Sequence, residues 1–400
     1  MAMIASPSGI MREITYLLKR RYPSFVFGSE NLRNEIPIFV YHTVDPHSFE
    51  DQLQYIVHNH YRTLTADEFY LWLTGKLSLS DRSILLTMDD GRKSVWTYAY
   101  PLLKKYGVKA SVYIIPSQVE TEMEPAPTLE DVWQGRCSLK ELETYDPSDA
   151  RLLSWQEIER MQRDGLIEFQ SHTLYHNKIF TSPKIVGFYG PDSVSRFPKF
   201  YDIPVASVAE LEFCVNRKEA LFGQPLHGHL PLMQGSARYS GDETLRESCR
   251  QYFQEKWSSQ SLPRNWQQEL FSFASRHRQL NGECGVFNSL EETKAEILHS
   301  LVSSKALIEE HLPGTAANHL CYPYGAFSEL STELSKSVGY QTNFCTTLPD
   351  RWTNRQGDNP YRCVRLKNDY IFRLPGKGRR PLSTILMRKL QRRMKGETGY

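Results

Sequence analysis

An apolar run that ends in two aspartates and a glycine constrains the fold of this chain most strongly. Ile84-Leu85-Leu86 has the length and the β-branched start of a buried strand, and Asp89 and Asp90 follow at its C-terminal tip. Gly91 then favours a tight turn. Two acids this close together are both ionised at low cost only when a cation shares the site. The sequence therefore predicts a strand that delivers two carboxylates and a bound cation to one end of a sheet.

Strand-like and helix-like segments alternate along the chain, as they do in a barrel of βα units. The best-marked helix follows Ser289 and Glu292, which form a capping-box pattern. Catalytic residues of such barrels lie at the C-terminal tips of the strands. The strand candidates are residues 36–41, 83–88, 110–115, 167–170, 319–322 and 341–346.

Two histidines downstream add the chemistry of a metal ligand set. His172 and His176 are spaced i, i+4, so a helical turn would place both imidazoles on one side, within reach of one divalent ion. Together with Asp90 they would form a two-histidine, one-carboxylate set that leaves positions open for water and substrate. Asp89 would stay free to act as a base. Zinc (Zn²⁺) is the expected metal, and cobalt, nickel or iron would suit the same donors.

Three motifs, in the same order along the chain, resemble the polysaccharide deacetylase family, also called the NodB-homology or carbohydrate esterase 4 group. Residues 87–91 are similar to its first motif, with Met88 in place of an aromatic residue, and residues 172–176 are similar to its second. Residues 321–325 resemble the wall of its substrate groove. The resemblance implies an α/β fold, a distorted (β/α) barrel of the NodB type. It also implies metal-dependent removal of an N-acetyl group from a sugar, in a bacterial polysaccharide or glycolipid pathway.

The same resemblance implies further roles around the metal. Arg365 occurs where related chains place an arginine beside the base, and its planar guanidinium would hold Asp89 through two hydrogen bonds. The backbone N–H of Tyr324 would stabilise the oxyanion. The apolar wall against which a sugar ring stacks would consist of Tyr322, Pro323 and Tyr324.

The general acid departs from the usual family pattern. Members commonly carry it in a late Leu-x-His motif, but this chain has no histidine after His319. Residues 36–44 instead resemble the N-terminal motif of the circularly permuted exopolysaccharide-deacetylase branch, which assigns the acid to His42. A histidine that only hydrogen-bonds at a strand end is the alternative. Arg92 is a second departure, and a cation there would either favour an anionic substrate or face solvent.

The chain is expected to contain one elaborated barrel over residues 35–375. Residues 1–34 would form a helical segment and residues 376–400 a basic amphipathic tail. Two insertions, about 119–150 and 180–287, exceed what the barrel requires. The second is too long for an unstructured loop, and its aromatic content predicts a mainly helical lid over the groove.

The charge pattern separates the tail from the rest of the chain. The net charge is only +2 and no nucleic-acid motif occurs, so nucleic acid is not an expected partner. Residues 377–395, however, contain eight lysines and arginines and no acid. A helix here would either contact an anionic membrane surface peripherally or dock on the barrel with its basic face in solvent. Its apolar positions at i, i+4 spacing are Leu382, Leu386, Leu390 and Met394.

The sequence favours a cytoplasmic location. Residues 1–12 lack the pattern of a secretory signal, and the seven scattered cysteines without Cys-x-x-Cys pairs favour reduced thiols. A cytoplasmic enzyme would act on a nucleotide-linked or lipid-linked N-acetyl sugar rather than on finished polysaccharide. The alternatives are a carbohydrate O-acetyl esterase or another C–N amidohydrolase on the same fold, and a catalytically silent carbohydrate-binding protein.

Overall fold

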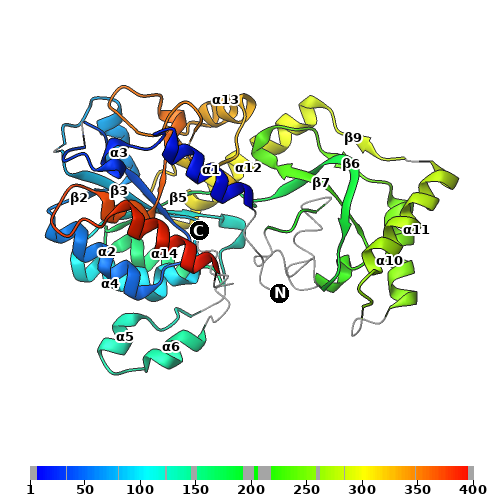
Figure 1. Ribbon diagram of the computed structural model, residues 1–400, viewed down its shortest axis with the longest axis horizontal. Coiled ribbons are helices and arrows are strands. Elements are labelled where there is room, and N and C mark those ends of the chain that lie inside the picture. Colours follow the sequence, from blue (N-terminus) through cyan, green and yellow to red (C-terminus); the bar gives the residue numbers. More distant parts are fainter. Residues whose placement is uncertain are drawn as a thin grey trace. The chain divides into compact units, whose positions relative to one another are not determined.

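The computed structural model describes residues 7–32, 34–79, 81–121, 124–145, 151–191, 202–205, 218–257, 262–282, 284–346 and 348–394. Within these ranges the chain forms two compact units (Figure 1). The first unit contains residues 1–174, 301–325 and 335–400, and the second contains residues 175–300 and 326–334.

The first unit is built on a parallel sheet with the order β12-β11-β10-β5-β4-β3-β1-β13. The strands at the two ends of this order are adjacent in sequence, because only Arg365 separates β12 from β13. One stretch of chain therefore pairs with β11 on one side and with β1 on the other, which nearly closes the sheet into the expected barrel. The strands are β1 (Ile38–Tyr41), β3 (Ser83–Met88), β4 (Ala110–Ile114), β5 (Ile167–Ser171), β10 (His319–Cys321), β11 (Thr342–Cys345), β12 (Cys363–Val364) and β13 (Leu366–Lys367), and β2 (Arg62–Leu64) adds to β3.

Every strand segment predicted from the sequence is present, with some ends shifted by one or two residues. β3 shows why the apolar run was informative, since all six of its residues are buried. Ile84 and Leu86 belong to one buried cluster, whereas Leu85 belongs to a second one with Tyr113 and Phe344 from other strands. A strand with two buried faces has no polar alternation and reads as a continuous apolar run.

Helices alternate with the strands. α3 and α12 begin with capping boxes, and the predicted one at α12 is formed by the backbone N–H of Ser289 donating to Glu292 at 2.7 Å and that of Glu292 donating to Ser289 Oγ at 3.2 Å. The helices are α2 (Pro46–His58), α3 (Ala66–Leu73), α4 (Tyr100–Tyr106), α7 (Trp155–Arg163), α12 (Leu290–His311) and α13 (Glu329–Val338).

The first predicted insertion contains two short helices, α5 (Leu129–Trp133) and α6 (Leu139–Tyr145). Buried polar contacts attach its first part to the barrel. Glu120 contacts Lys93 Nζ at 3.4 Å, the backbone N–H of Ala126 donates to Glu157 at 3.0 Å, and the indole of Trp96 donates to the carbonyl of Ala126 at 2.7 Å. The first residues of this insertion are therefore held against the barrel.

The second unit holds the described part of the long insertion. It contains the expected helices, α10 (Glu243–Lys256) and α11 (Trp266–Asn281), which pack on Phe188 through Leu245, Phe253 and Leu270. It also contains an antiparallel ribbon that the sequence did not suggest, β6 (Lys178–Phe188) with β7 (Pro225–Pro231), and a shorter pair, β8 (Tyr239–Ser240) with β9 (Val286–Phe287). Residues 192–201 and 206–217 lie outside the described ranges. The lid role stays a prediction.

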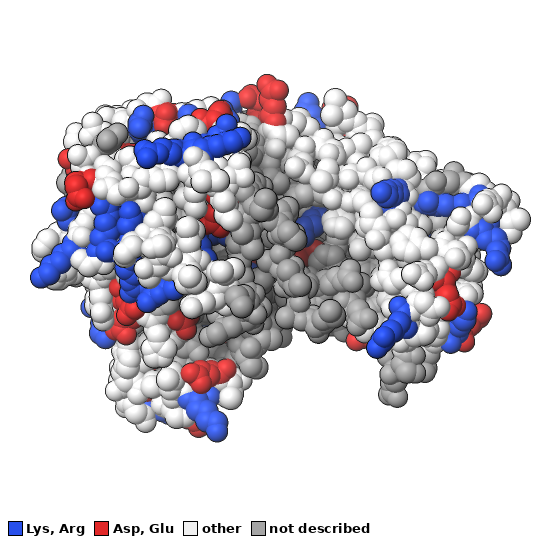
Figure 2. Space-filling view, viewed as in Figure 1, with Lys and Arg blue, Asp and Glu red and all other residues white. Residues whose placement is uncertain are grey.

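The C-terminal helix α14 (Leu382–Met394) docks on the first unit. Its buried positions are Ile385 and Lys389, at 2% and 6% exposure, whereas Leu390 is 47% exposed. The predicted apolar register is therefore shifted, because Lys389 reaches Glu13 of α1 (Pro7–Leu18) at 2.5 Å and needs a buried position to do so. On the face shown in Figure 2, basic and acidic side chains of the first unit are interspersed. Among the described residues, no helix combines the length and the apolarity that a membrane crossing needs.

Candidate active site

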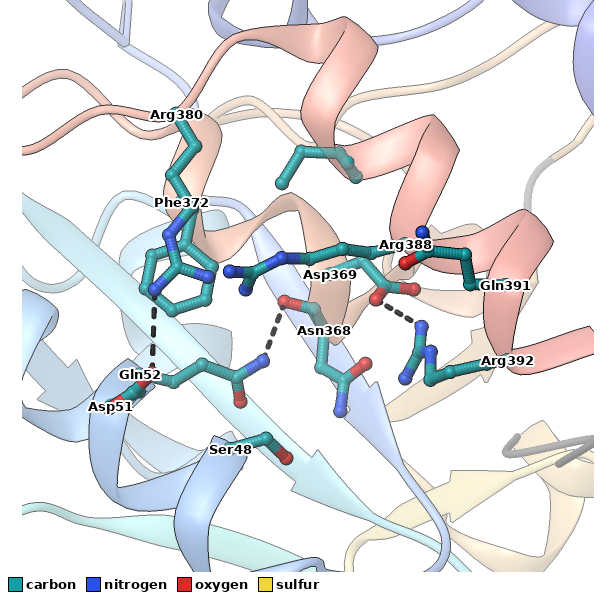
Figure 3. A pocket seen from close by; sticks show the side chains of 11 residues that line it. Ser48, Asp51, Gln52, Asn368, Asp369, Phe372, Arg380, Arg388, Gln391 and Arg392 are labelled. Carbon is teal, nitrogen blue, oxygen red and sulfur yellow. Dashed lines mark hydrogen bonds and ion pairs between the residues drawn. The ribbon is translucent and has the colours of Figure 1, made fainter. Parts of the chain in front are cut away.

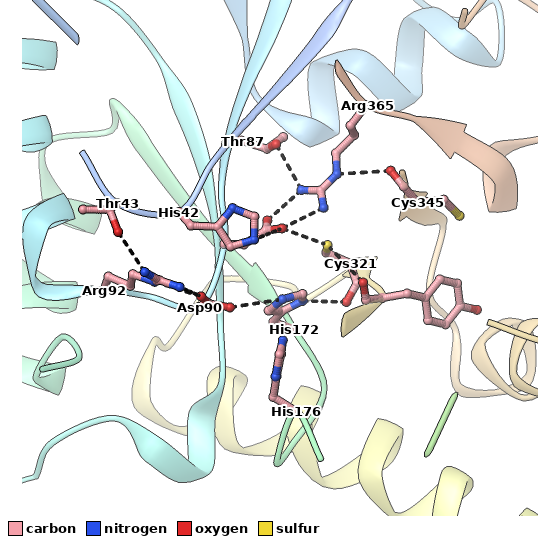
Figure 4. Close-up of polar contacts among 12 residues, drawn as sticks. His42, Thr43, Thr87, Asp90, Arg92, His172, His176, Cys321, Cys345 and Arg365 are labelled. Carbon is pink, nitrogen blue, oxygen red and sulfur yellow. Dashed lines mark hydrogen bonds and ion pairs between the residues drawn. The ribbon is translucent and has the colours of Figure 1, made fainter. Parts of the chain in front are cut away.

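The turn after β3 places Asp89 and Asp90 beside different partners, and Figure 4 shows Asp90 between Arg92 and His172. Asp90 and Gly91 both have left-handed backbones, each with a φ of 71°. Gly91 is required here because a Cβ would also lie only 2.9 Å from Cγ2 of Ile114. The turn separates an Asp89 paired with Arg365 from an Asp90 that faces His172.

Asp90, His172 and His176 form the candidate metal centre. All three are buried, and their ligand atoms lie within 4.8 Å of one another. Nδ1 of His172 lies 2.8 Å from the carbonyl oxygen of Cys321, and Nε2 lies 3.5 Å from Oδ1 of Asp90. A histidine that donates from Nδ1 to a carbonyl presents the Nε2 lone pair to a metal. Nδ1 of His176 lies 3.7 Å from Oδ1 of the Asp202 carboxylate, which is beyond hydrogen-bond distance.

The electrostatics of this centre also suit a cation. Burial lowers the pKa of the His172 imidazole, but Cys321 and the two aspartates raise it by more. The pKa therefore lies well above its ordinary value. The site thus stabilises positive charge at this point even without a metal. Two imidazoles and a carboxylate with these hydrogen-bond partners fit a divalent transition metal.

The two histidines meet through a loop, not through the predicted helical turn. Residues 172–176 are not helical, and Thr173 and His176 have left-handed φ values of 65° and 56°. These two residues break the helical path at both ends of the segment. The expectation of a helix was therefore wrong, although the two imidazoles do come together.

Arg365 holds Asp89 through both carboxylate oxygens. Nη1 and Nη2 donate to Oδ1 and Oδ2 at 2.6 and 2.7 Å, and the guanidinium also reaches Thr87 Oγ1 at 3.1 Å and the carbonyl of Cys345 at 3.3 Å. Burial alone would raise the pKa of Asp89. Arg365 and the nearby histidines lower it by more, so the pKa is about 2. Asp89 is therefore fully ionised at neutral pH.

His42 follows β1 and lies beside Asp89. Its Nε2 is 3.7 Å from Oδ2 of Asp89, and 19% of its side chain is exposed. Burial is the main reason that its pKa is lowered, although Asp90 and Asp89 act in the opposite direction. His42 is therefore a neutral imidazole next to a carboxylate, at a position that solvent can reach.

The predicted substrate wall is smaller than expected. Tyr322 is fully buried, and its hydroxyl accepts a hydrogen bond from Asn343 at 2.7 Å, so its ring belongs to the core. Pro323 is also buried. These two side chains do not fit the substrate-binding role. Tyr324, with a left-handed φ of 59° and 39% exposure, is the member of this wall whose ring reaches the surface.

Arg92 takes neither of the two roles considered for it. Its Nε and Nη2 donate to Oδ2 of Asp90 at 2.9 and 2.8 Å, and Nη1 donates to Thr43 at 2.8 Å. Arg92 thus contacts one oxygen of the Asp90 carboxylate and leaves the other facing His172. This contact, and those of Thr43, Cys321 and Asp202, were not predicted from the sequence. The sequence feature that could have indicated two of these residues is their position beside candidate site residues, since Thr43 follows His42 and Cys321 precedes Tyr322.

We expect Arg92→Gln to bind zinc several-fold more tightly than the unchanged protein, because a cation beside Asp90 weakens the carboxylate as a ligand. Calorimetric titration of metal-free protein measures this directly. Arg92→Lys keeps the charge and serves as the matched variant, with an affinity close to the original. Weaker binding by Arg92→Gln would show that the arginine's main effect is to orient Asp90.

Two other groupings of metal-binding residue types occur among the described residues. Asp89, His172 and Cys321 share His172 with the centre above, but Arg365 already binds both oxygens of Asp89. The second grouping is Asp67, Glu168 and His319. His319 begins β10 and donates or accepts at 2.8 Å to Asp67 and 2.7 Å to Thr342, so this cluster lies at the opposite, N-terminal end of the strands as a hydrogen-bonded network.

The strand order and these contacts define a (β/α) barrel protein with a candidate metal centre at the C-terminal ends of its strands. Residues 76–187 match the family model described as polysaccharide deacetylase. Over these residues, which include Asp89, Asp90, His172 and His176, the chain is similar to the polysaccharide deacetylase family.

Curated relatives match part of the chain. YxkH of Bacillus subtilis, named as a polysaccharide deacetylase, is 34% identical over 93 residues, which are 21% of this chain and 33% of that protein. The poly-beta-1,6-N-acetyl-D-glucosamine N-deacetylase of Staphylococcus aureus is 27% identical over 149 residues, 37% of this chain and 41% of that protein. The chain thus spans well under half the length of either relative.

Solved structures show a more distant likeness. The de-N-acetylase of Aggregatibacter actinomycetemcomitans has a TM-score of 0.49 at 15% identity and covers 84% of this chain and 95% of that one. The BpsB deacetylase domain of Bordetella bronchiseptica has a TM-score of 0.48 at 16% identity, with 84% and 97% covered. At these scores the fold assignment depends on the strand order itself.

Proposed function

We propose that this protein is a metal-dependent hydrolase that removes the N-acetyl group from an N-acetylated sugar. The observation that carries the proposal is that the two adjacent aspartates after β3 have different partners. Asp90 shares a centre with two histidines, whereas Asp89, one residue earlier, is paired with Arg365 and lies beside His42. Hydrolysis of an amide requires an activated water and a proton donor for the amine, and these two groups of residues supply places for both.

Asp90, His172 and His176 would hold the metal. When bound, a divalent metal supplies Lewis acidity and makes water a better nucleophile at neutral pH. A carboxylate with a pKa of about 2 is a weak base, so Asp89 would need a water made more acidic by a bound metal in order to accept its proton. The low pKa of Asp89 therefore supports metal dependence.

The proton that Asp89 accepts has a short route to the leaving group. His42 is neutral and lies 3.7 Å from Oδ2 of Asp89, so it takes that proton and then donates it to the sugar nitrogen as the C–N bond breaks. The left-handed backbone at Tyr324 sets the direction of its N–H, which would stabilise the oxyanion. Its exposed ring would stack against the sugar.

The test combines metal content with acetate release from N-acetylglucosamine in free, nucleotide-linked, lipid-linked and β-1,6-linked oligomeric forms. We expect one metal per chain, and acetate release that is lost on chelation and restored by zinc. Release from an O-acetylated sugar but not from any N-acetyl substrate would assign the esterase activity instead. A protein with one bound metal that releases no acetate from any of these compounds would contradict the proposal.

His42→Ala is expected to lower turnover by about 10²–10³-fold with metal content unchanged, because it removes the proton donor but no metal ligand. Acetate release and mass-spectrometric metal analysis on the same sample measure the two effects separately. His47→Ala, an exposed histidine on α2, is the matched control. Unchanged turnover in His42→Ala would reduce His42 to a residue that only hydrogen-bonds at a strand end.

We further propose that the enzyme acts in the cytoplasm on a carrier-linked precursor of a polysaccharide or glycolipid. Two observations support this proposal. The six cysteines in the described part of the chain are free thiols, and α14 exposes the basic Arg388 beside the apolar Met387 and Leu390. Fractionation of cells that express the native protein tests the location, and recovery in the periplasm or the medium would overturn it.

A further inference from the structure

A second pocket lies in the first unit, away from the residues described above. It has a volume of about 240 Å³ and is formed between α2, α14 and the short helix η9 (Asn368–Arg373) (Figure 3). Gln52 ties its walls together, because its amide accepts from the hydroxyl of Tyr41 at 2.7 Å and donates to the carbonyl of Asn368 at 3.3 Å. α2 and η9 begin shortly after the C-terminal ends of β1 and β13, so the pocket flanks the catalytic end of the barrel on its outer side.

Positive charge in this pocket exceeds the negative charge available to balance it. Three arginines and two aspartates line it. Arg392 pairs with Asp369, which also faces Lys389 at 3.7 Å. Arg380 contacts Asp51 at 3.4 Å, but 59% of that aspartate's side chain is exposed to water, which weakens the pair.

Arg388 is the uncompensated charge. Among the described residues, no carboxylate lies within ion-pair distance of its guanidinium and no hydrogen bond reaches it, although it lines the pocket (Figure 3). Arg388 is exposed, and its positive charge acts on another cation of the pocket, Arg380. Burial lowers the pKa of Arg380, and repulsion from Arg388 lowers it further. Two guanidiniums that repel each other in one concave site would both be stabilised by a bound anion.

We propose that this pocket binds a phosphate group. A phosphate carries up to two charges and presents several oxygens, so it would satisfy Arg388 and Arg380 together, whereas one carboxylate would balance only one of them. The ring of Phe372, with the guanidinium carbon of Arg380 3.4 Å from its centroid, holds that arginine in place. Ser48 and Asn368 add neutral polar groups at the rim. The phosphate would come either from a soluble phosphorylated compound or from a phospholipid headgroup, and the inference does not depend on the deacetylase activity.

The experiment uses the full chain and two kinds of probe. Inorganic phosphate and glycerol 3-phosphate are titrated by calorimetry, and co-sedimentation compares vesicles of phosphatidylcholine alone with vesicles that also contain phosphatidic acid. Arg388→Gln should lose at least tenfold in affinity for the preferred probe. Arg276→Gln, an exposed arginine on α11 that likewise has no ion pair in the described residues, should bind as the unchanged protein does.

Asp51→Asn provides a gain that misfolding cannot produce. It removes the carboxylate that competes for Arg380, so phosphate should bind several-fold more tightly. Binding of the soluble probes identifies a soluble ligand, and binding that requires phosphatidic acid vesicles identifies a lipid headgroup. The proposal fails if the unchanged protein binds neither probe, or if Arg388→Gln and Asp51→Asn both bind with unchanged affinity.

Discussion

Asp89→Asn is expected to reduce acetate release by about 10²–10⁴-fold while the metal stays bound, because the change removes the proton acceptor and leaves Asp90, His172 and His176 in place. The amide of asparagine keeps the shape of the carboxylate but carries no negative charge. Acetate release and metal content measured on the same preparation check this result.

The neighbouring arginine makes a control necessary. Arg365 is only 4% exposed, and in Asp89→Asn its charge loses the carboxylate that balances it, so part of any loss would come from destabilisation. The double variant Asp89→Asn with Arg365→Met removes both charges. It should recover stability relative to Asp89→Asn but recover no activity. Recovery of activity in the double variant would show that Asp89 balances the charge of Arg365 and does not act as the proton acceptor.

The sequence predicted the barrel well because burial on both faces gives its strands a pattern that is visible locally. β3 is apolar along its whole length, and its terminal aspartates mark the catalytic end. β4 is buried along its whole length in the same way. The capping box at Ser289 and Glu292 is equally local, since all of its hydrogen bonds lie within one helical turn.

Features that the sequence did not reveal depend on contacts between distant residues. The left-handed φ of Thr173 and His176 is unusual for these residue types and persists only because the surrounding structure holds it. The burial of Tyr322 depends on Asn343, which lies on the neighbouring strand β11. The register of α14 depends on Glu13, more than 350 residues earlier. None of these partners is adjacent in sequence.

The second large effect is on stability. Arg365→Met should destabilise the protein by roughly 3–5 kcal/mol at neutral pH, because it leaves the Asp89 carboxylate buried without its cation. The same change should raise the pKa of Asp89 from its present value of about 2, since burial then acts without Arg365 to oppose it. Denaturant unfolding at pH 7 measures the loss. Arg362→Met, which removes an arginine paired with the exposed Asp350 at 2.8 Å, should cost less than about 1 kcal/mol.

The pH dependence of the stability difference tests whether the unpaired charge of Asp89 causes the loss in Arg365→Met. In the unchanged protein the carboxyl has a lower pKa when folded than when unfolded, so the pair stabilises the fold above about pH 4 and this contribution is lost as the pH falls toward 2. In Arg365→Met we expect burial to outweigh the remaining histidines and to raise the folded pKa of Asp89 above the unfolded one, so the penalty should be present at neutral pH and disappear on acidification. The difference in stability between the two proteins should therefore shrink between pH 7 and pH 4. A difference that stays constant over this range would mean that lost packing around the arginine side chain, and not an unpaired carboxylate, destabilises the variant.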